Sequence, residues 1–139
     1  MQQFPIKDIE DLQSISSAMK WQYFEKLVAF IFEQNGFDVR QNVVVKGFGT
    51  KRQFDVIAKH YDVTWLVECK KWKGKQRSLA GATRKHLERC ELYEGLYGTA
   101  NPLIVSLIDD DIISVDNVFV VPIMKLNWFI NNLDSIELE

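Results

Sequence analysis

Residues 53–70 read QFDVIAKHYDVTWLVECK. The stretch divides into two short runs, Arg52–His60 and Val63–Lys70, which are rich in the Val, Ile, Phe and Trp side chains of half-buried strands. A two-residue turn at Tyr61 and Asp62 would join the two runs into an antiparallel hairpin. The sequence therefore predicts a β-hairpin at the centre of the chain.

The register of this hairpin decides which side chains meet. If the turn takes two residues, Asp55 lies opposite Glu68 and Gln53 lies opposite Lys70, with paired Cβ atoms about 5 Å apart. Because side chains alternate between the faces of a strand, all four polar side chains project from one face. A slip of one residue would send the two carboxylates to opposite faces unless a bulge restored them. The other face collects apolar side chains that suit a core: Phe54, Val56, Ala58, Val63, Trp65 and Val67.

Asp55 and Glu68 would repel each other at this distance, so one of them would stay protonated unless a cation lay between them. Hard carboxylate oxygens suit Mg²⁺ or Mn²⁺, and Mg²⁺ commonly takes one or two carboxylates together with water and phosphate oxygens. Lys70, on the same face, would handle a proton or stabilise charge beside the ion. The alternative from the residues alone is a cluster of charged side chains on an exposed sheet face.

The spacing of Asp55 and Glu68-Cys69-Lys70 resembles the D…ExK signature of the restriction-endonuclease-like PD-(D/E)xK nucleases. The strings FDVIA and VECKKW are similar to the Mrr-like restriction enzymes and, more distantly, to archaeal Holliday-junction resolvases. Phe54 stands where the name-giving proline would be. The resemblance covers roughly residues 21–129. It implies an α/β fold with a restriction-endonuclease-like αβββαβ core, a mixed central sheet flanked by helices. The length of 139 residues itself predicts a single domain over residues 1–139.

The resemblance implies a metal-dependent DNA endonuclease that hydrolyses phosphodiester bonds to 5′-phosphate and 3′-hydroxyl ends. Asp55, Glu68 and the backbone carbonyl of Cys69 would hold Mg²⁺, with Mn²⁺ as a substitute, and no small-molecule cofactor beyond the metal is expected. Lys70 would orient or deprotonate the attacking water, or stabilise the developing charge. The alternative function is a non-cleaving nucleic-acid-binding subunit that keeps the nuclease fold within a larger assembly.

A helix is expected from about Ser16 or Ser17 to Asn35, with Gly36 after its end. The apolar stripe of this helix contains one ionisable residue, Glu25. An ionisable group in such a stripe is paired, ligated or placed at the edge, and the edge is the commoner explanation. The resemblance instead implies that Glu25 points into the acidic cluster and joins the catalytic residues.

Charge is distributed unevenly along the chain. The net charge is −2, yet thirteen of the seventeen Lys and Arg residues lie between Arg40 and Cys90, with four of the nineteen acidic residues. Such a stretch can meet phosphate as one basic face. Its densest part, residues 70–77, directly follows the ExK strand, although a charged run is often only a solvated loop. The candidate nucleic-acid contacts are Gln53, Lys71, Lys73, Lys75 and Arg77.

The remaining sequence predicts the elements that complete the core. These are a strand at Phe37–Val45, a glycine-containing connector at Lys46–Lys51, a helix from Ser78 to about Tyr97, strands at Pro102–Ile108 and Val118–Val121, and a closing helix from Pro122 to Asn131. Two histidines, His60 and His86, are expected at the surface or at its boundary.

Several features bear on location and partners. No apolar run approaches the length of a membrane span, the first residues lack a signal-peptide profile, and Cys69 and Cys90 have no zinc-binding spacing. We therefore expect a cytoplasmic protein with reduced cysteines and no membrane partner. DNA is the expected partner, and a homodimer is expected because one active site cuts one strand. The apolar segment Val118–Phe129 is the candidate dimer interface.

Overall fold

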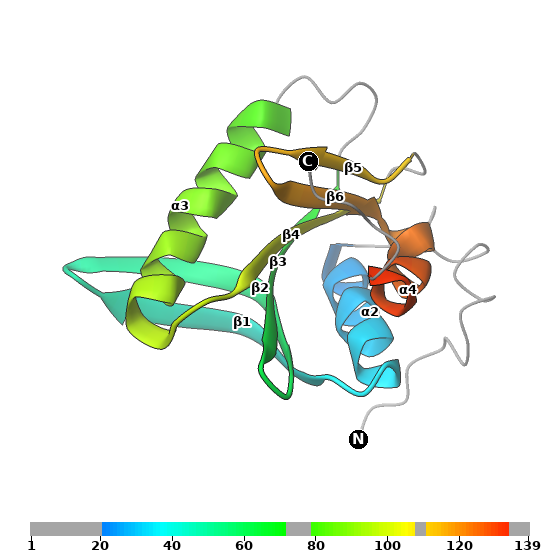
Figure 1. Cartoon of the computed structure of the whole chain (residues 1–139), viewed down its shortest axis with the longest axis horizontal. Coiled ribbons are helices and arrows are strands. Elements are labelled where there is room, and N and C mark those ends of the chain that lie inside the picture. The colour runs from blue at the N-terminus through cyan, green and yellow to red at the C-terminus, as the bar shows by residue number, and fades with distance from the viewer. Residues whose placement is uncertain (1–20, 72–78, 108–110, 134–139) are drawn as a thin grey trace.

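The computed structural model of the chain describes residues 21–71, 79–107 and 111–133. Its elements, in chain order, are α2 (Trp21–Gln34), β1 (Asp38–Gly47), β2 (Thr50–His60), β3 (Val63–Lys70), α3 (Leu79–Tyr97), β4 (Asn101–Ser106), β5 (Ile113–Val115), β6 (Val118–Pro122) and α4 (Ile123–Asn131). The strands form one sheet in the order β1-β2-β3-β4-β6-β5. Helices α2 and α4 cover one face of the sheet, and α3 covers the other (Figure 1).

The sheet is mixed, as the sequence predicts. β1, β2 and β3 form an antiparallel meander, whereas β4 lies parallel to both β3 and β6. Parallel neighbours need a long crossover connection, and α3 supplies the one between β3 and β4. The predicted αβββαβ core is therefore present, with β5 and α4 added after it.

The core lies on both faces of the sheet. The prediction that only one face of the β2–β3 hairpin packs against a core is therefore wrong. Val56 and Val67 pack with α2 and α4, as expected, but Leu66 on the opposite face is also fully buried, against α3. Burial on both faces is typical of central strands in α/β folds. Two predicted core residues differ from expectation, because Phe54 packs on the α3 face and Val63 is 38% exposed.

The central hairpin follows the predicted register near its turn. Paired residues run from His60 and Val63 to Val56 and Val67, so two residues form the turn. Tyr61 takes a left-handed φ of 55° there. Bulky residues seldom adopt this conformation, and Tyr-Asp is not one of the dipeptides that favour a two-residue hairpin turn.

β2 and β3 separate where the acidic residues lie. The β2–β3 ladder ends at the pair Val56–Val67. The residues of β2 before Val56 pair only with β1, and the residues of β3 after Val67 pair only with β4. The predicted cross-strand pairs Asp55–Glu68 and Gln53–Lys70 are therefore wrong as ladder pairs. Gln53 instead pairs with β1.

A distortion at Asn42 and Asp55 accounts for the separation. Asn42 has a φ of 54°, and the β1–β2 ladder omits the Asn42–Asp55 pair although the pairs on both sides keep one register. On the two sides of this distortion, the β1–β2 hairpin consequently presents opposite faces to α3. Val39 packs with α2 and α4, whereas Val43 and Phe54 pack with α3.

Other elements differ from expectation at their ends. The predicted connector at Lys46–Lys51 is the tip of the β1–β2 hairpin, and the unpredicted strand β5 turns into β6 through Asp116 and Asn117, both with positive φ. The expected helix starts at Ser16 or Ser17 and at Ser78 lie outside the described residues. None of the described helices has the length and apolar character needed to cross a membrane.

The segment Val118–Phe129, which the sequence predicts as the dimer interface, contributes mainly to the protein's own core. The homodimer itself stays a prediction. Val118 and Val121 in β6, and Ile123 and Leu126 in α4, are fully buried within the chain. Trp128 is 51% exposed, and it is the exception among the large apolar side chains of this segment.

Candidate active site

Asp55 bridges the two strands at the point where their ladder ends. With no β2 backbone opposite, the N–H of Cys69 in β3 donates to the Asp55 carboxylate, with 2.8 Å between N and Oδ2. A side chain thus takes the place of a backbone acceptor. This hydrogen bond fixes the Asp55 carboxylate beside the backbone of the ExK strand.

Glu68 lies next to Asp55 and contacts two cations. Its side chain is 12% exposed, its Oε2 accepts a hydrogen bond from Arg89 in α3, and its Oε1 lies 4.0 Å from Nζ of Lys70. Burial and the neighbouring Asp55 carboxylate raise the pKa of Glu68 to about 7, although Arg89 and Lys70 act in the opposite direction. The two carboxylates therefore lie close enough to favour a shared proton, as expected for an acidic pair.

The donor set of this acidic pair fits a hard divalent cation. Within the described ranges, no group of three or more His, Cys, Asp or Glu side chains could hold a metal ion. Asp55 and Glu68 provide two carboxylates, which is a number that Mg²⁺ commonly takes from a protein. Because Arg89 and Lys70 do not offset the rise in the pKa of Glu68, the pair can accept further positive charge.

Glu25 lies inside the protein and not at an exposed edge of α2. Its residue exposure is 9%. Burial raises the pKa of the fully buried Cys69 thiol, and the charges of Asp55, Glu25 and Glu68 raise it further. Carboxylates from α2, β2 and β3 therefore all lie near enough to this thiol for their charges to act on it. Glu25 does not join the other two in a metal-binding cluster of side chains, so its predicted role requires action through water or a second ion.

Two residues at this site, His86 and Arg89, were not predicted as part of it. His86 is fully buried, so its prediction as a surface residue is wrong. Its Nδ1 lies 3.0 Å from Arg89, and its Nε2 lies 2.8 Å from the carbonyl oxygen of Leu66. Arg89 can only donate, so Nδ1 accepts and Nε2–H donates, which makes the imidazole neutral. His86 thereby orients the guanidinium that contacts Glu68.

The sequence contained a signal for this pair. His86 lies four residues before Cys90, which is on the buried stripe of α3, and three residues before Arg89. Residues three and four apart share a helix face, so a histidine at this position belongs to the interior.

Replacing His86 by glutamine is expected to remove a pH dependence of stability between about pH 6.5 and pH 4. Burial lowers the pKa of His86 from 6.5 to about 4. In this range the unfolded chain binds more protons at His86 than the native protein does, so wild-type stability is lost as the pH falls. The full loss corresponds to about 3 kcal/mol.

Urea unfolding near pH 7 and near pH 4.5 measures this effect. Glutamine keeps an N–H for the Leu66 carbonyl but cannot titrate. The raised pKa of Glu68 acts in the opposite direction, because its stabilising effect is lost as the pH rises from 4.5 to about 7, and both proteins share it. The readout is therefore the difference between wild type and His86→Gln. If both lose stability in parallel on acidification, His86 is not neutral and buried as described.

The candidate nucleic-acid contacts fall in different places. Gln53 is exposed on β2, in the part of the hairpin that has left β3, and Lys71 is exposed directly after the ExK strand. The other three, Lys73, Lys75 and Arg77, lie outside the described residues.

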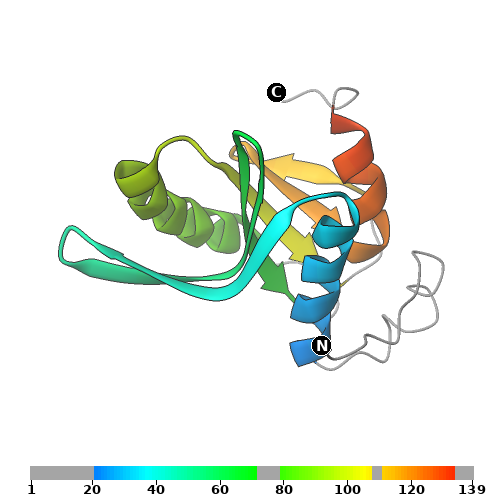
Figure 2. The ribbon, with the colours of Figure 1, turned by 90° about the horizontal axis from the view of Figure 1, so that it is seen from below.

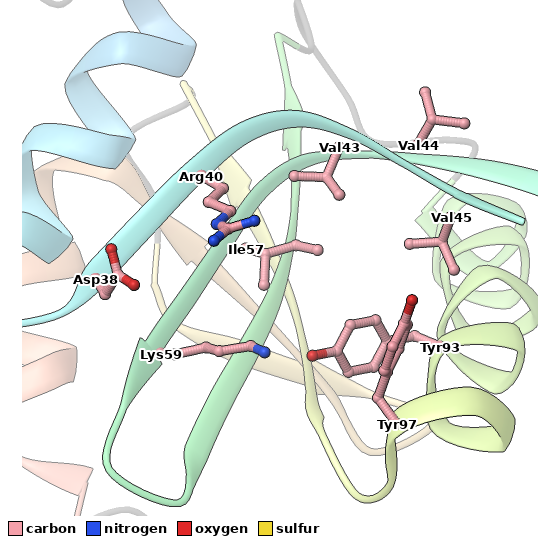
Figure 3. A pocket seen from close by; sticks show the side chains of 9 residues that line it. All are labelled: Asp38, Arg40, Val43, Val44, Val45, Ile57, Lys59, Tyr93 and Tyr97. Atoms are coloured by element: carbon pink, nitrogen blue, oxygen red, sulfur yellow. The ribbon is translucent and has the colours of Figure 1, made fainter.

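A cavity of about 310 Å³ lies elsewhere, between the β1–β2 hairpin and the C-terminal part of α3 (Figure 3). Its polar lining includes Arg40, Lys59, Tyr93 and Tyr97. Lys59 points toward the two tyrosines, and its Nζ is 5.9 Å from the ring centroid of Tyr93. None of the acidic pair or Lys70 lines this cavity, so the candidate chemistry belongs to the strand separation and not to the cavity.

Comparison with known proteins identifies the part of the chain that contains this site. Residues 16–89, more than half of the 139, match the family described as restriction endonuclease. The chain belongs to the Mrr-like restriction endonuclease family. An uncharacterized protein of Archaeoglobus fulgidus is 33% identical to this family member in an alignment of 119 positions, which covers 83% of the present chain and 92% of that protein.

The restriction-endonuclease-like fold is also seen in similar solved structures. The small subunit of the heterodimeric restriction endonuclease R.BspD6I matches 94% of this chain and 79% of its own, with a TM-score of 0.62 and 15% identity. A protein of unknown function, AF1548, matches 78% of this chain with a TM-score of 0.54 and 22% identity. The present chain spans 54% of that protein. At these identities the likeness concerns the fold.

Proposed function

We propose that this protein is a metal-dependent DNA endonuclease. The observation that carries the proposal is the meeting of Asp55, Glu68 and Lys70 where β2 and β3 separate, in a chain of the restriction endonuclease family. The pKa of Glu68 stays raised although Arg89 and Lys70 both act to lower it, which supports a site that would be completed by a further cation. Hydrolysis would leave 5′-phosphate and 3′-hydroxyl ends.

Each residue has a distinct part in this proposal. Asp55, Glu68 and the Cys69 carbonyl would hold Mg²⁺ or Mn²⁺, which when bound supplies Lewis acidity and a more acidic water. Lys70 would orient the attacking water or stabilise the charge that develops beside it. Arg89 occupies one oxygen of Glu68 and so keeps the other directed toward Lys70.

Cleavage assays on a panel of linear, branched, modified and single-stranded DNAs, each with Mg²⁺ or Mn²⁺, test the proposal. We expect at least one substrate to be cut by wild type and not by the Asp55→Asn protein, whose side-chain oxygen can still accept the hydrogen bond from the Cys69 N–H. Binding of DNA without any cleavage across the panel would contradict the proposed activity and favour a non-cleaving subunit. Because one active site cuts one strand, cutting of both strands is expected to need two copies of the chain. The cytoplasmic location stays a prediction from the sequence.

The salt dependence of DNA binding is expected to decrease when Lys71, Lys73, Lys75 and Arg77 are replaced by alanine. Each phosphate contact releases condensed counterions, so the slope of log K against log salt concentration should fall by about one for each lost contact. Fluorescence anisotropy over a salt series, with a chelator present to prevent cleavage, measures the slope. An unchanged slope would show that this segment does not contact the DNA backbone.

A further inference from the structure

Residues 43–54, the distal half of the β1–β2 hairpin, form a two-stranded arm. Within the described sheet, the part of β2 that precedes Val56 is not paired with β3. It stays paired with β1 as far as the pair Gly47–Thr50 at the tip. The arm projects beyond the body of the protein, past the end of α3, in both views (Figures 1 and 2). A two-stranded ribbon is marginally stable alone, so its position depends on contacts with the helix.

One face of the arm packs on α3. Val45 and Phe54 on this face are buried in the cluster that contains Tyr93. At the tip, a Cβ added to Gly47 would lie 2.8 Å from the side chain of Leu96, so the absence of a side chain at Gly47 permits this close approach. The arm is therefore fixed against the helix, and none of the described residues covers its other face.

The uncovered face carries an electrostatically unfavourable pair. Lys46 and Lys51 lie directly opposite each other, and both are exposed. Like charges opposite each other destabilise a strand pair. The arm contains no acidic residue, and within the described ranges neither lysine is in an ion pair. Such a pair costs stability in the free protein, and a bound polyanion would relieve the repulsion.

The tip adds an exposed aromatic ring. Phe48 is 76% exposed and has a left-handed φ of 51°. A Cβ at Gly95 would lie 3.1 Å from this ring, so the ring rests against α3 at one edge and is otherwise open to solvent. Exposed rings beside a basic surface are a common way for proteins to stack on the unpaired bases of single-stranded nucleic acid.

We propose that this arm lies along the DNA next to the cleavage site, with Lys46 and Lys51 on phosphates and Phe48 against a base or sugar at its tip. The proposal rests on the proposed nuclease function and adds a surface to it. Lys51 is four residues from Asp55 along β2, or about 13 Å. This is roughly the axial span of four nucleotides of one strand, so the DNA would need to extend about that far beyond the cut.

Binding measurements on the double variant Lys46→Ala/Lys51→Ala test the arm. With a labelled DNA duplex that carries a single-stranded extension, and with a chelator present, we expect the slope of log K against log salt concentration to fall by about two, and affinity at low salt to fall at least roughly tenfold. The thermal unfolding midpoint should equal or exceed that of wild type, because the repulsion is gone. A lysine that served only the fold would show the opposite stability change.

Two further variants sharpen the result. Phe48→Ala should lower affinity roughly tenfold without changing the salt slope, because a ring carries no charge. The matched control Lys26→Ala/Lys59→Ala removes two exposed lysines that lie over tyrosine rings elsewhere, and its slope should equal that of wild type.

The outcomes separate the two proposals. If wild type binds and cuts DNA while the Lys46→Ala/Lys51→Ala protein keeps the wild-type salt slope, the arm does not contact DNA and the nuclease function stands. If wild type neither binds nor cuts any DNA of the panel, both proposals fail. A fall in slope equal to that of the Lys26→Ala/Lys59→Ala control would also overturn the arm, because it would reflect net charge alone.

Discussion

Replacing Asp55 by asparagine is expected to lower the rate of DNA cleavage by at least about 10³-fold, equivalent to about 4 kcal/mol of transition-state stabilisation, while the fold survives. The substitution removes one of the two carboxylates proposed to hold the metal. The asparagine oxygen can still accept the hydrogen bond from the Cys69 N–H, which Asp55 accepts at 2.8 Å in the wild type. Single-turnover cleavage and titration calorimetry with Mn²⁺ measure the two losses.

Asparagine is the better substitution because alanine disturbs the strand separation. Asp55→Ala would leave the partly buried Cys69 N–H without its acceptor, at a cost of about 1–3 kcal/mol. Removing the carboxylate altogether is therefore expected to destabilise the protein, although it also removes repulsion from Glu68. Asp62→Asn, in the exposed turn of the same hairpin, is the control. Wild-type Mn²⁺ affinity and turnover in the Asp55→Asn protein would exclude this site.

Glu25→Gln is expected to lower turnover by roughly 10²-fold. Glutamine has nearly the same shape as glutamate but lacks the charge, and Glu25 is 9% exposed on the inner side of α2. Its charge acts on Cys69 together with those of Asp55 and Glu68. Removing one of three neighbouring negative charges should weaken the positioning of the metal and its water, yet leave stability equal or higher.

Cleavage rates at saturating Mg²⁺ and thermal melts together distinguish a catalytic from a structural role for Glu25. The same substitution at Glu33, an exposed glutamate of the same helix, should change neither quantity. A reduced melting temperature with turnover within about twofold of wild type would place Glu25 in the structural framework and leave the acidic pair and Lys70 as the site.

Much of the fold followed from local patterns. Strand alternation and a two-residue turn predicted the register from His60–Val63 to Val56–Val67, which is confirmed. The apolar runs predicted the central strands β4 and β6, because segments that are apolar throughout are buried on both faces. These signals depend on residues close together in the chain, so they could be read without the tertiary structure.

The geometry of the site depends on contacts that local patterns do not contain. The separation of β2 from β3 coincides with Asn42, a residue of a different strand that adopts a left-handed conformation opposite Asp55. The pairing of Glu68 with Arg89 requires α3 to cross the sheet above β3. Residue types and spacing predicted that Asp55 and Glu68 would meet. They could not predict that a carboxylate would replace a ladder bond or that a helix would supply a cation.

Because the Cys69 N–H is hydrogen-bonded to the Asp55 carboxylate, the hydrogen exchange of this amide reports on the position of the Asp55 side chain. Amide protons of a sheet exchange with deuterium when the strands that protect them open. The Cys69 amide is protected by a carboxylate at 2.8 Å, whereas Val67, two residues earlier, stays paired with Val56. Deuterium uptake at Cys69 compared with Val67 would therefore follow the movements of Asp55 within an intact sheet, without substrate and without turnover.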